Sequence, residues 1–129
     1  MQSSAVEGTG AGARAAADRL TVDVRIHGRT VVVSPAGELD HDSVALLSGR
    51  LADALGRPDG RRLVVDCRDL WFCDSTGLNA LLAARLAAEE AGSPLVLAGL
   101  QPTVARVFGI TGVDRVFDIR PDLDAAILR

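Results

Sequence analysis

The sequence predicts a single α/β domain with a mixed, largely parallel sheet of four to six strands and helices packed against it. The 129 residues are enough for one compact domain with a core of its own. Hydrophobic residues make up 48% of the chain and aromatic residues only 3%, so we expect an aliphatic core. From about residue 30 onward, strand-like segments alternate with helix-like segments, which is typical of a sheet covered by helices.

The first half of the chain predicts two strands and a helix. Apolar and polar residues alternate over residues 21–26, the period of a half-buried strand. A turn at residues 27–29 should lead into a more buried strand over 30–35. The sequence Gly-Glu-Leu-Asp at 37–40 should end that strand, and apolar residues at helical spacing then predict a helix over 43–56.

The second half continues the alternation. We expect, in order, a short buried strand over 61–66, a loop, a helix from 75 to about 91, a strand over 94–98, a helix from 101 to 109, a less regular strand over 113–119 and a helix over 122–128. In the helix that begins at Ser75, the spacing predicts a buried stripe made of Leu78, Leu81, Leu82 and Leu86.

The N-terminal segment predicts no compact structure. Residues 1–19 combine Gly, Ser and Ala with a single Val, so we expect a disordered tail followed by a domain over 20–129. No run reaches the roughly 18 apolar residues that a membrane span requires, and the N-terminus lacks the apolar block of a signal peptide. We expect Cys67 and Cys73 to be reduced, buried thiols, and the protein to be cytoplasmic.

The net charge of the chain and the motifs that it lacks exclude several classes of function. The net charge of −3 argues against nucleic-acid binding. A hydrolase elbow needs Gly two positions before its serine, where this chain has Cys73, and a phosphate-binding loop needs a Lys, which the chain lacks. A phosphate-receiver domain would use Asp66 together with an acidic pair and a Lys that are missing. His27 and His41 are too isolated for a metal site. We therefore expect a binding protein that is not an enzyme and needs no metal or cofactor.

The segment most able to carry chemistry is Leu-Val-Val-Asp-Cys-Arg-Asp-Leu-Trp-Phe-Cys-Asp-Ser-Thr-Gly-Leu at 63–78. Asp74, Ser75 and Thr76 are good residues for the start of a helix, and Gly77 would let that helix approach the sheet closely. The same helix start would also favour a bound or attached phosphate. Local physics alone leaves both the capping and the functional interpretation open.

Four short motifs in register resemble one family. Gly37-Glu38-Leu39-Asp40, Leu63-Val64-Val65-Asp66, Asp74-Ser75-Thr76-Gly77-Leu78 and the segment 104–113 follow one another as in STAS domains of the anti-sigma-factor-antagonist type. The resemblance covers about residues 20–128. Each motif is weak alone, but the four together at these intervals are specific.

The resemblance implies a switch controlled by phosphorylation. Such antagonists bind an anti-sigma factor that is also a serine kinase, and so release the sigma factor. The kinase, which uses ATP and Mg²⁺, would phosphorylate Ser75 and end the binding, and a serine phosphatase would reset the cycle. Asp40 is implied to lie beside the phosphorylation site, and Thr76 is the competing acceptor. The antagonist itself would need no cofactor.

Trp71 departs from the family pattern, which usually has a small or polar residue at this loop position. It is either a contact for the partner or a loop aromatic folded over the edge of the sheet. Two alternatives to the antagonist also stay open. One is a STAS scaffold or sensor module with another partner and an unmodified Ser75; the other is a small enzyme or nucleotide-binding protein. We expect a monomer that binds neither nucleic acid nor membranes.

Overall fold

The computed structural model describes residues 19–57 and 62–128. The predicted N-terminal tail therefore lies outside the described residues, apart from Arg19. The elements run, in chain order, β1 (Leu20–His27), β2 (Thr30–Leu39), α2 (Val44–Leu55), β3 (Arg62–Asp66), β4 (Leu70–Cys73), α3 (Ser75–Glu90), β5 (Leu95–Ala98), α4 (Pro102–Thr111), the 3₁₀ helix η2 (Val113–Arg115), β6 (Asp118–Arg120) and α5 (Leu123–Ile127).

The strands of the described part form one mixed sheet of six, as predicted. Five of them lie in the order β1-β2-β3-β5-β6, and β4 pairs with the far end of β2. β1 and β2 are antiparallel, and every other pair is parallel. The mixed, largely parallel sheet expected from the alternation of elements is therefore confirmed.

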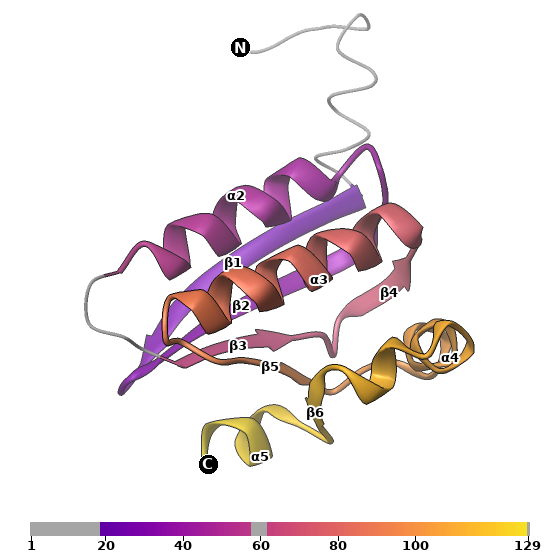
Figure 1. Ribbon diagram of the computed structural model, residues 1–129. Helices are drawn as coiled ribbons and strands as arrows, with labels where there is room; N and C mark the ends of the chain where they lie inside the picture. Colours follow the sequence, from indigo (N-terminus) through magenta and orange to yellow (C-terminus); the bar gives the residue numbers. More distant parts are fainter. Residues whose placement is uncertain (1–18, 58–61, 129) are drawn as a thin grey trace, which may run out of the picture.

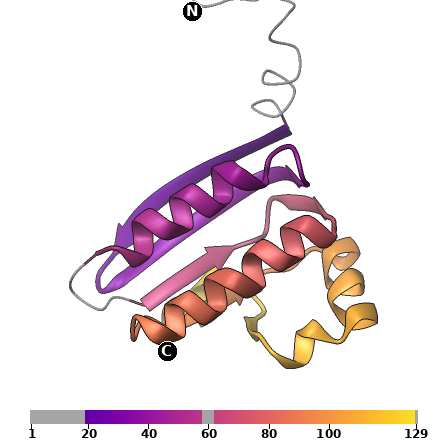
Figure 2. The same cartoon turned by 45° about the horizontal axis from the view of Figure 1, so that its top comes forward.

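Helices cover both faces of the sheet, but unequally. α2 and α3 lie side by side over one face (Figures 1 and 2), and the main core lies between them and the strands. A smaller cluster on the opposite face joins Val32, Val64 and Val96 to Ala126 of α5. The central strands have apolar residues on both sides because both of their faces are buried. The core is aliphatic, as predicted, except for the pair Phe108 and Phe117, whose rings are tilted by 43° with centroids 5.5 Å apart.

The loop predicted before Ser75 contains a strand, and β2 is longer than predicted. β4 (Leu70–Cys73) runs parallel to β2, and β2 continues to Leu39 instead of stopping at Gly37. Gly37 has φ +114°, and a Cβ there would lie 2.0 Å from the carbonyl oxygen of Arg19. Only glycine therefore allows the strand to pass so close to Arg19. A four-residue strand is too short to produce a recognisable sequence period, which explains why it was missed.

Two further predictions were wrong in the second half of the chain. The strand expected over 113–119 is the 3₁₀ helix η2 followed by the short β6, and α4 ends at Thr111 rather than at Gly109. Leu86 was expected in the buried stripe of α3, but its side chain is 58% exposed. Ala84 and Ala88 are buried in its place, because small side chains let α3 pack closely against the sheet.

Candidate functional site

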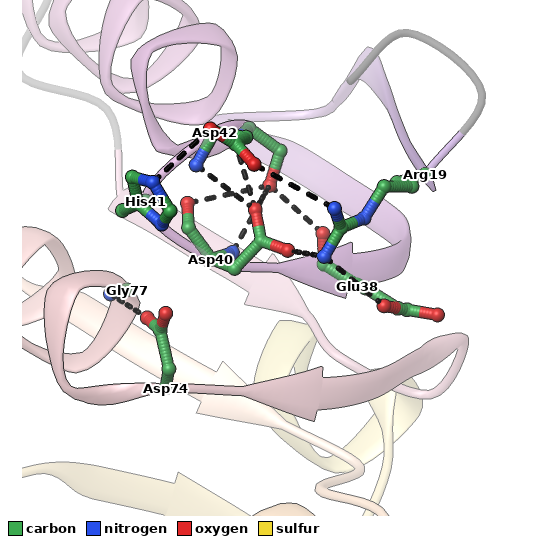
Figure 3. Close-up of polar contacts among 8 residues, drawn as sticks. Arg19, Glu38, Asp40, His41, Asp42, Asp74 and Gly77 are labelled. Carbon is green, nitrogen blue, oxygen red and sulfur yellow. Dashed lines mark hydrogen bonds and ion pairs between the residues drawn. The ribbon is translucent and has the colours of Figure 1, made fainter. Parts of the chain in front are cut away.

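The candidate site lies where the neighbouring strands β2 and β4 end. Leu39 and Cys73 are register partners at the carboxyl ends of β2 and β4. Asp40 and Asp74 come directly after them, and the backbone N–H of Asp74 donates to the carbonyl of Leu39 at 3.1 Å. The two loops therefore start side by side at one edge of the sheet (Figure 3). Ligand sites of open α/β sheets lie at this edge.

Asp74 and Gly77 have the structural roles that local physics predicted. Asp74 is the N-cap of α3, and its Oδ1 accepts a hydrogen bond from the backbone N–H of Gly77 at 2.9 Å. Gly77 is buried, and a Cβ there would lie 2.7 Å from Cγ of Leu39. The glycine thus allows α3 to begin directly on top of β2.

Ser75 and Thr76 are left outside this scaffold. Ser75 is the first residue of α3, as predicted, and both side chains are exposed. Neither side chain forms a hydrogen bond with any residue that the structure describes. Because Asp74 fills the capping position, a modification of Ser75 removes no cap and disturbs no core contact.

The side chain of Asp40 forms most of its hydrogen bonds within its own loop. Asp40 is 4% exposed, and its carboxylate accepts hydrogen bonds from the Arg19 guanidinium and from the backbone N–H groups of Asp42 (3.0 Å) and Ser43 (3.1 Å). The oxygen of the Ser43 hydroxyl lies 3.2 Å from the same carboxylate and accepts a hydrogen bond from the backbone N–H of Asp40 at 3.0 Å. Figure 3 shows the carboxylate among these partners, with Asp74 on the neighbouring loop. The backbone of Asp40 thus lies near the start of α3, while its side chain orders the β2–α2 loop.

Arg19, which the sequence predicts to lie in the disordered tail, belongs to the candidate site. Its guanidinium contacts Asp40 and also lies 3.5 Å from the Glu38 carboxylate and 3.6 Å from that of Asp42. It therefore ties the start of β1 to the β2–α2 loop. An arginine just before a strand gives no sequence signal for such a role, because its partners lie about twenty residues away.

Trp71 lies on β4 and not in a loop, which corrects its predicted placement. Its side chain is 59% exposed, and that of the next residue, Phe72, is 47% exposed. The indole is therefore not folded over the sheet edge as a buried cover. The carbonyl of Trp71 accepts a hydrogen bond from the Thr103 hydroxyl of α4 at 3.1 Å.

The two cysteines are free and buried, as predicted. Burial, with a smaller contribution from the Asp74 carboxylate, raises the pKa of the Cys73 thiol from 9.0 to about 12. Burial also raises the pKa of the Cys67 thiol, with Asp66 adding to the effect. Both thiols are therefore protonated and poor nucleophiles at neutral pH.

The residues that the structure describes contain neither a candidate metal site nor a candidate membrane-spanning helix. Their His, Cys, Asp and Glu side chains form no group of three that could hold a metal ion. No helix within residues 19–57 and 62–128 is both long and apolar enough to cross a membrane.

Several known proteins are similar to this chain in sequence and in fold. The family model described as "Mlab, STAS domain" matches residues 22–121. The anti-sigma-B factor antagonist of Bacillus subtilis is 30% identical over 78% of this chain and 90% of its own length. The crystal structure of an anti-sigma factor antagonist from Mycobacterium paratuberculosis is 28% identical, covers 86% of this chain and 93% of that chain, and has a TM-score of 0.78. SpoIIAA, an anti-sigma factor antagonist solved in its unphosphorylated form, is 25% identical, with a TM-score of 0.71 over 83% of this chain and 93% of that one. These names agree with the prediction of a regulatory binding protein rather than an enzyme.

Proposed function

The chain belongs to the STAS-domain family, and we propose that it acts as an anti-sigma-factor antagonist that is switched by phosphorylation at Ser75. In this proposal the unphosphorylated form binds a serine-kinase anti-sigma factor and so releases the sigma factor. The kinase then phosphorylates Ser75 and the complex separates. The observation that carries the proposal is an exposed serine at the start of α3, in a chain similar to proteins named as antagonists of anti-sigma factors.

The surroundings of Ser75 suit an acceptor that a second protein must reach. The hydroxyl is exposed, and the backbone beneath it is fixed by the Asp74 cap and by the packing of Gly77 on Leu39. A kinase would therefore meet a rigid, pre-organised target. The electropositive N-terminus of α3 favours an attached phosphate, so the fold should survive the modification.

The same phosphate should disrupt an interface built around the unmodified serine. It adds a charge of about −1.5 to −2 next to the Asp74 carboxylate. If its repulsion and desolvation cost about 4 kcal/mol at the interface, binding falls about a thousandfold. A rigid domain can thus change its affinity for a partner without changing shape. A serine phosphatase would restore the binding form, and we place this cycle in the cytoplasm with the antagonist as a monomer.

Phosphosite mapping combined with binding measurements tests the proposal. Each purified kinase-type anti-sigma factor encoded by the same genome is incubated with the chain, ATP and Mg²⁺, and the product is analysed by intact-mass and fragment spectrometry. We expect one phosphate on Ser75 in the wild type and in Thr76→Ala, and none in Ser75→Ala. Thr76→Ala is the matched control because it removes the adjacent exposed hydroxyl.

Titration calorimetry then relates the modification to binding. Ser75→Ala should bind the kinase as tightly as the unphosphorylated wild type, and phosphorylated wild type at least about a hundredfold more weakly. Binding without any phosphate on Ser75 would favour the scaffold or sensor alternative. Phosphate on Thr76 alone would refute the proposed acceptor.

A further inference from the structure

A β-bulge turns two aromatic side chains to the solvent in β4, the strand that leads to Ser75. Leu70 pairs with Gly37 and Phe72 with Glu38, so Trp71 is an extra residue without a partner in β2. In a regular strand, side chains alternate, and either Trp71 or Phe72 would point into the core. The bulge instead buries Leu70 and Cys73 and exposes both aromatic residues between them.

The placement of this pair is unusual for a chain so poor in aromatic residues. The sequence has one Trp, three Phe and no Tyr. Phe108 and Phe117 pack against each other in the core. The other two lie next to each other on β4, three and four residues before Ser75, and both are exposed. Trp is among the residues most enriched at binding hot spots.

The strand that presents the pair is held on both sides. β2 pairs with one edge of β4, and on the other side the Thr103 hydroxyl of α4 bonds to the carbonyl of Trp71. An aromatic surface on a fixed backbone loses little conformational entropy when it binds.

Two acidic residues neighbour the aromatic pair, one across the sheet and one along the chain. Glu38, opposite Phe72 in the register, is paired with Arg19. Asp69 directly precedes β4, is exposed, and forms no ion pair with the described part of the chain. An apolar centre with a polar rim is the usual anatomy of a protein–protein interface. The unpaired carboxylate adds a place for a basic group of the partner, at the end of β4 away from Ser75.

We propose that Trp71 and Phe72 are the anchors by which this chain holds its anti-sigma factor. They insert into an apolar pocket of that protein, which carries a basic side chain opposite Asp69. The inference rests on the proposed function for the identity of the partner, and it adds the surface that gives the affinity. Because β4 leads directly into α3, an ordinary interface of about 800 Å² on each side that includes Ser75 is large enough to include this surface as well. The anchors thus set which anti-sigma factor is bound, and Ser75 sets when it is released.

Calorimetry with the unphosphorylated proteins tests the anchors. Trp71→Ala should weaken binding of the anti-sigma factor by at least about 30-fold, and Phe72→Ala by at least about fivefold. Asp69→Lys should also weaken it by about fivefold or more. Leu86→Ala, which truncates another exposed apolar side chain on the outer side of α3, is the matched control and should change the affinity less than about twofold. Circular dichroism of every variant checks that the fold is retained, as expected for exposed positions.

A second measurement needs no substitution. Trp71 is the only Trp, so growth with 5-fluorotryptophan gives this chain a single ¹⁹F resonance. Adding the unlabelled anti-sigma factor should shift and broaden that resonance, and phosphorylation of Ser75 should restore the free signal. Binding of the wild type with an unchanged ¹⁹F signal and an unchanged affinity for Trp71→Ala would overturn the anchors while leaving the proposed function in place. Failure of the wild type to bind any of the anti-sigma factors would overturn both.

Discussion

The loops that follow β2 and β4 begin from paired residues and contain the same residue types, yet they use them differently. In the β2–α2 loop, Asp40 and Ser43 are both buried and bonded to each other. In the β4–α3 connection, Asp74 caps the helix and Ser75 is exposed. One residue separates β4 from α3, whereas four residues separate β2 from α2. The longer loop must satisfy its own polar groups, and the short one leaves a serine free.

The β2–α2 loop therefore stabilises the fold, and we call it the supporting loop. The β4–α3 connection leaves Ser75 exposed to a partner, and we call it the displaying loop. The first loop and Arg19 form a polar network that holds the sheet edge in place. The second uses one hydrogen bond and one glycine contact for the same purpose, so its two hydroxyl side chains remain available to a partner. Four predictions, in order of decreasing effect, test this comparison.

Alkaline pH should weaken the core beneath the displaying loop. The folded-state pKa of both thiols is raised above 9.0, to about 12 for Cys73, so the unfolded chain loses these protons first as the pH rises. Stability is therefore complete below about pH 8 and falls by about 2–3 kcal/mol per pH unit above about pH 9.5. Urea unfolding at several pH values measures this slope.

The chain offers a clean control for this titration, because it contains no Tyr and all of its basic residues are Arg, which do not titrate in this range. The double variant Cys67→Ala, Cys73→Ala should be less stable at pH 7 and almost independent of pH between 8 and 11. A wild-type curve just as flat would show that the thiols are not shielded from water.

The two aspartates should differ in their contribution to stability. Asp40→Ala removes a buried carboxylate, so the Arg19 guanidinium and two backbone N–H groups lose their hydrogen-bond acceptor. We expect the free energy of unfolding to fall by about 3 kcal/mol. Asp74→Ala removes a single N-cap bond and should cost about 1 kcal/mol. Denaturant midpoints of both variants give the comparison directly. Equal losses would mean that the two loops contribute alike.

Gly77→Ala tests whether α3 depends on its close contact with β2. The added methyl group would press on Leu39 and on Sγ of Cys73, so we expect a loss of about 2 kcal/mol. The control is Gly49→Ala in α2, where an added Cβ would meet nothing within 4 Å. Because alanine has the higher helix propensity, this variant should raise the free energy of unfolding by about 0.5–1 kcal/mol. Thermal unfolding should shift the two variants in opposite directions.

The two serines give the smallest and most specific test. Ser43 is 2% exposed and its hydroxyl donates to the carbonyl of Glu38 at 2.8 Å, so Ser43→Ala should cost about 1.5 kcal/mol. Ser75→Ala should change stability by less than about 0.5 kcal/mol, because its hydroxyl supports nothing in the fold. A larger loss at Ser75, measured by urea unfolding, would contradict its role as a freely displayed acceptor.

Features that depend on neighbours along the chain were predictable from the amino-acid sequence. Alternating and helical periods located most strands and helices, because side chains two, three or four residues apart share a face. Asp74, Gly77 and the start of α3 at Ser75 were predictable for the same reason, since a cap and its helix lie within three residues of each other.

Features that depend on distant partners became visible only in the folded domain. The strand β4 exists because β2 offers it a paired edge, and its bulge decides that Trp71 and Phe72 both point outward. Asp40 is buried because Arg19, twenty-one residues earlier, reaches it across the sheet edge. Leu86 is exposed because the backbone of α3 packs close to the sheet through its alanines. Such contacts are selected by packing across the whole domain, and no local period in the sequence encodes them.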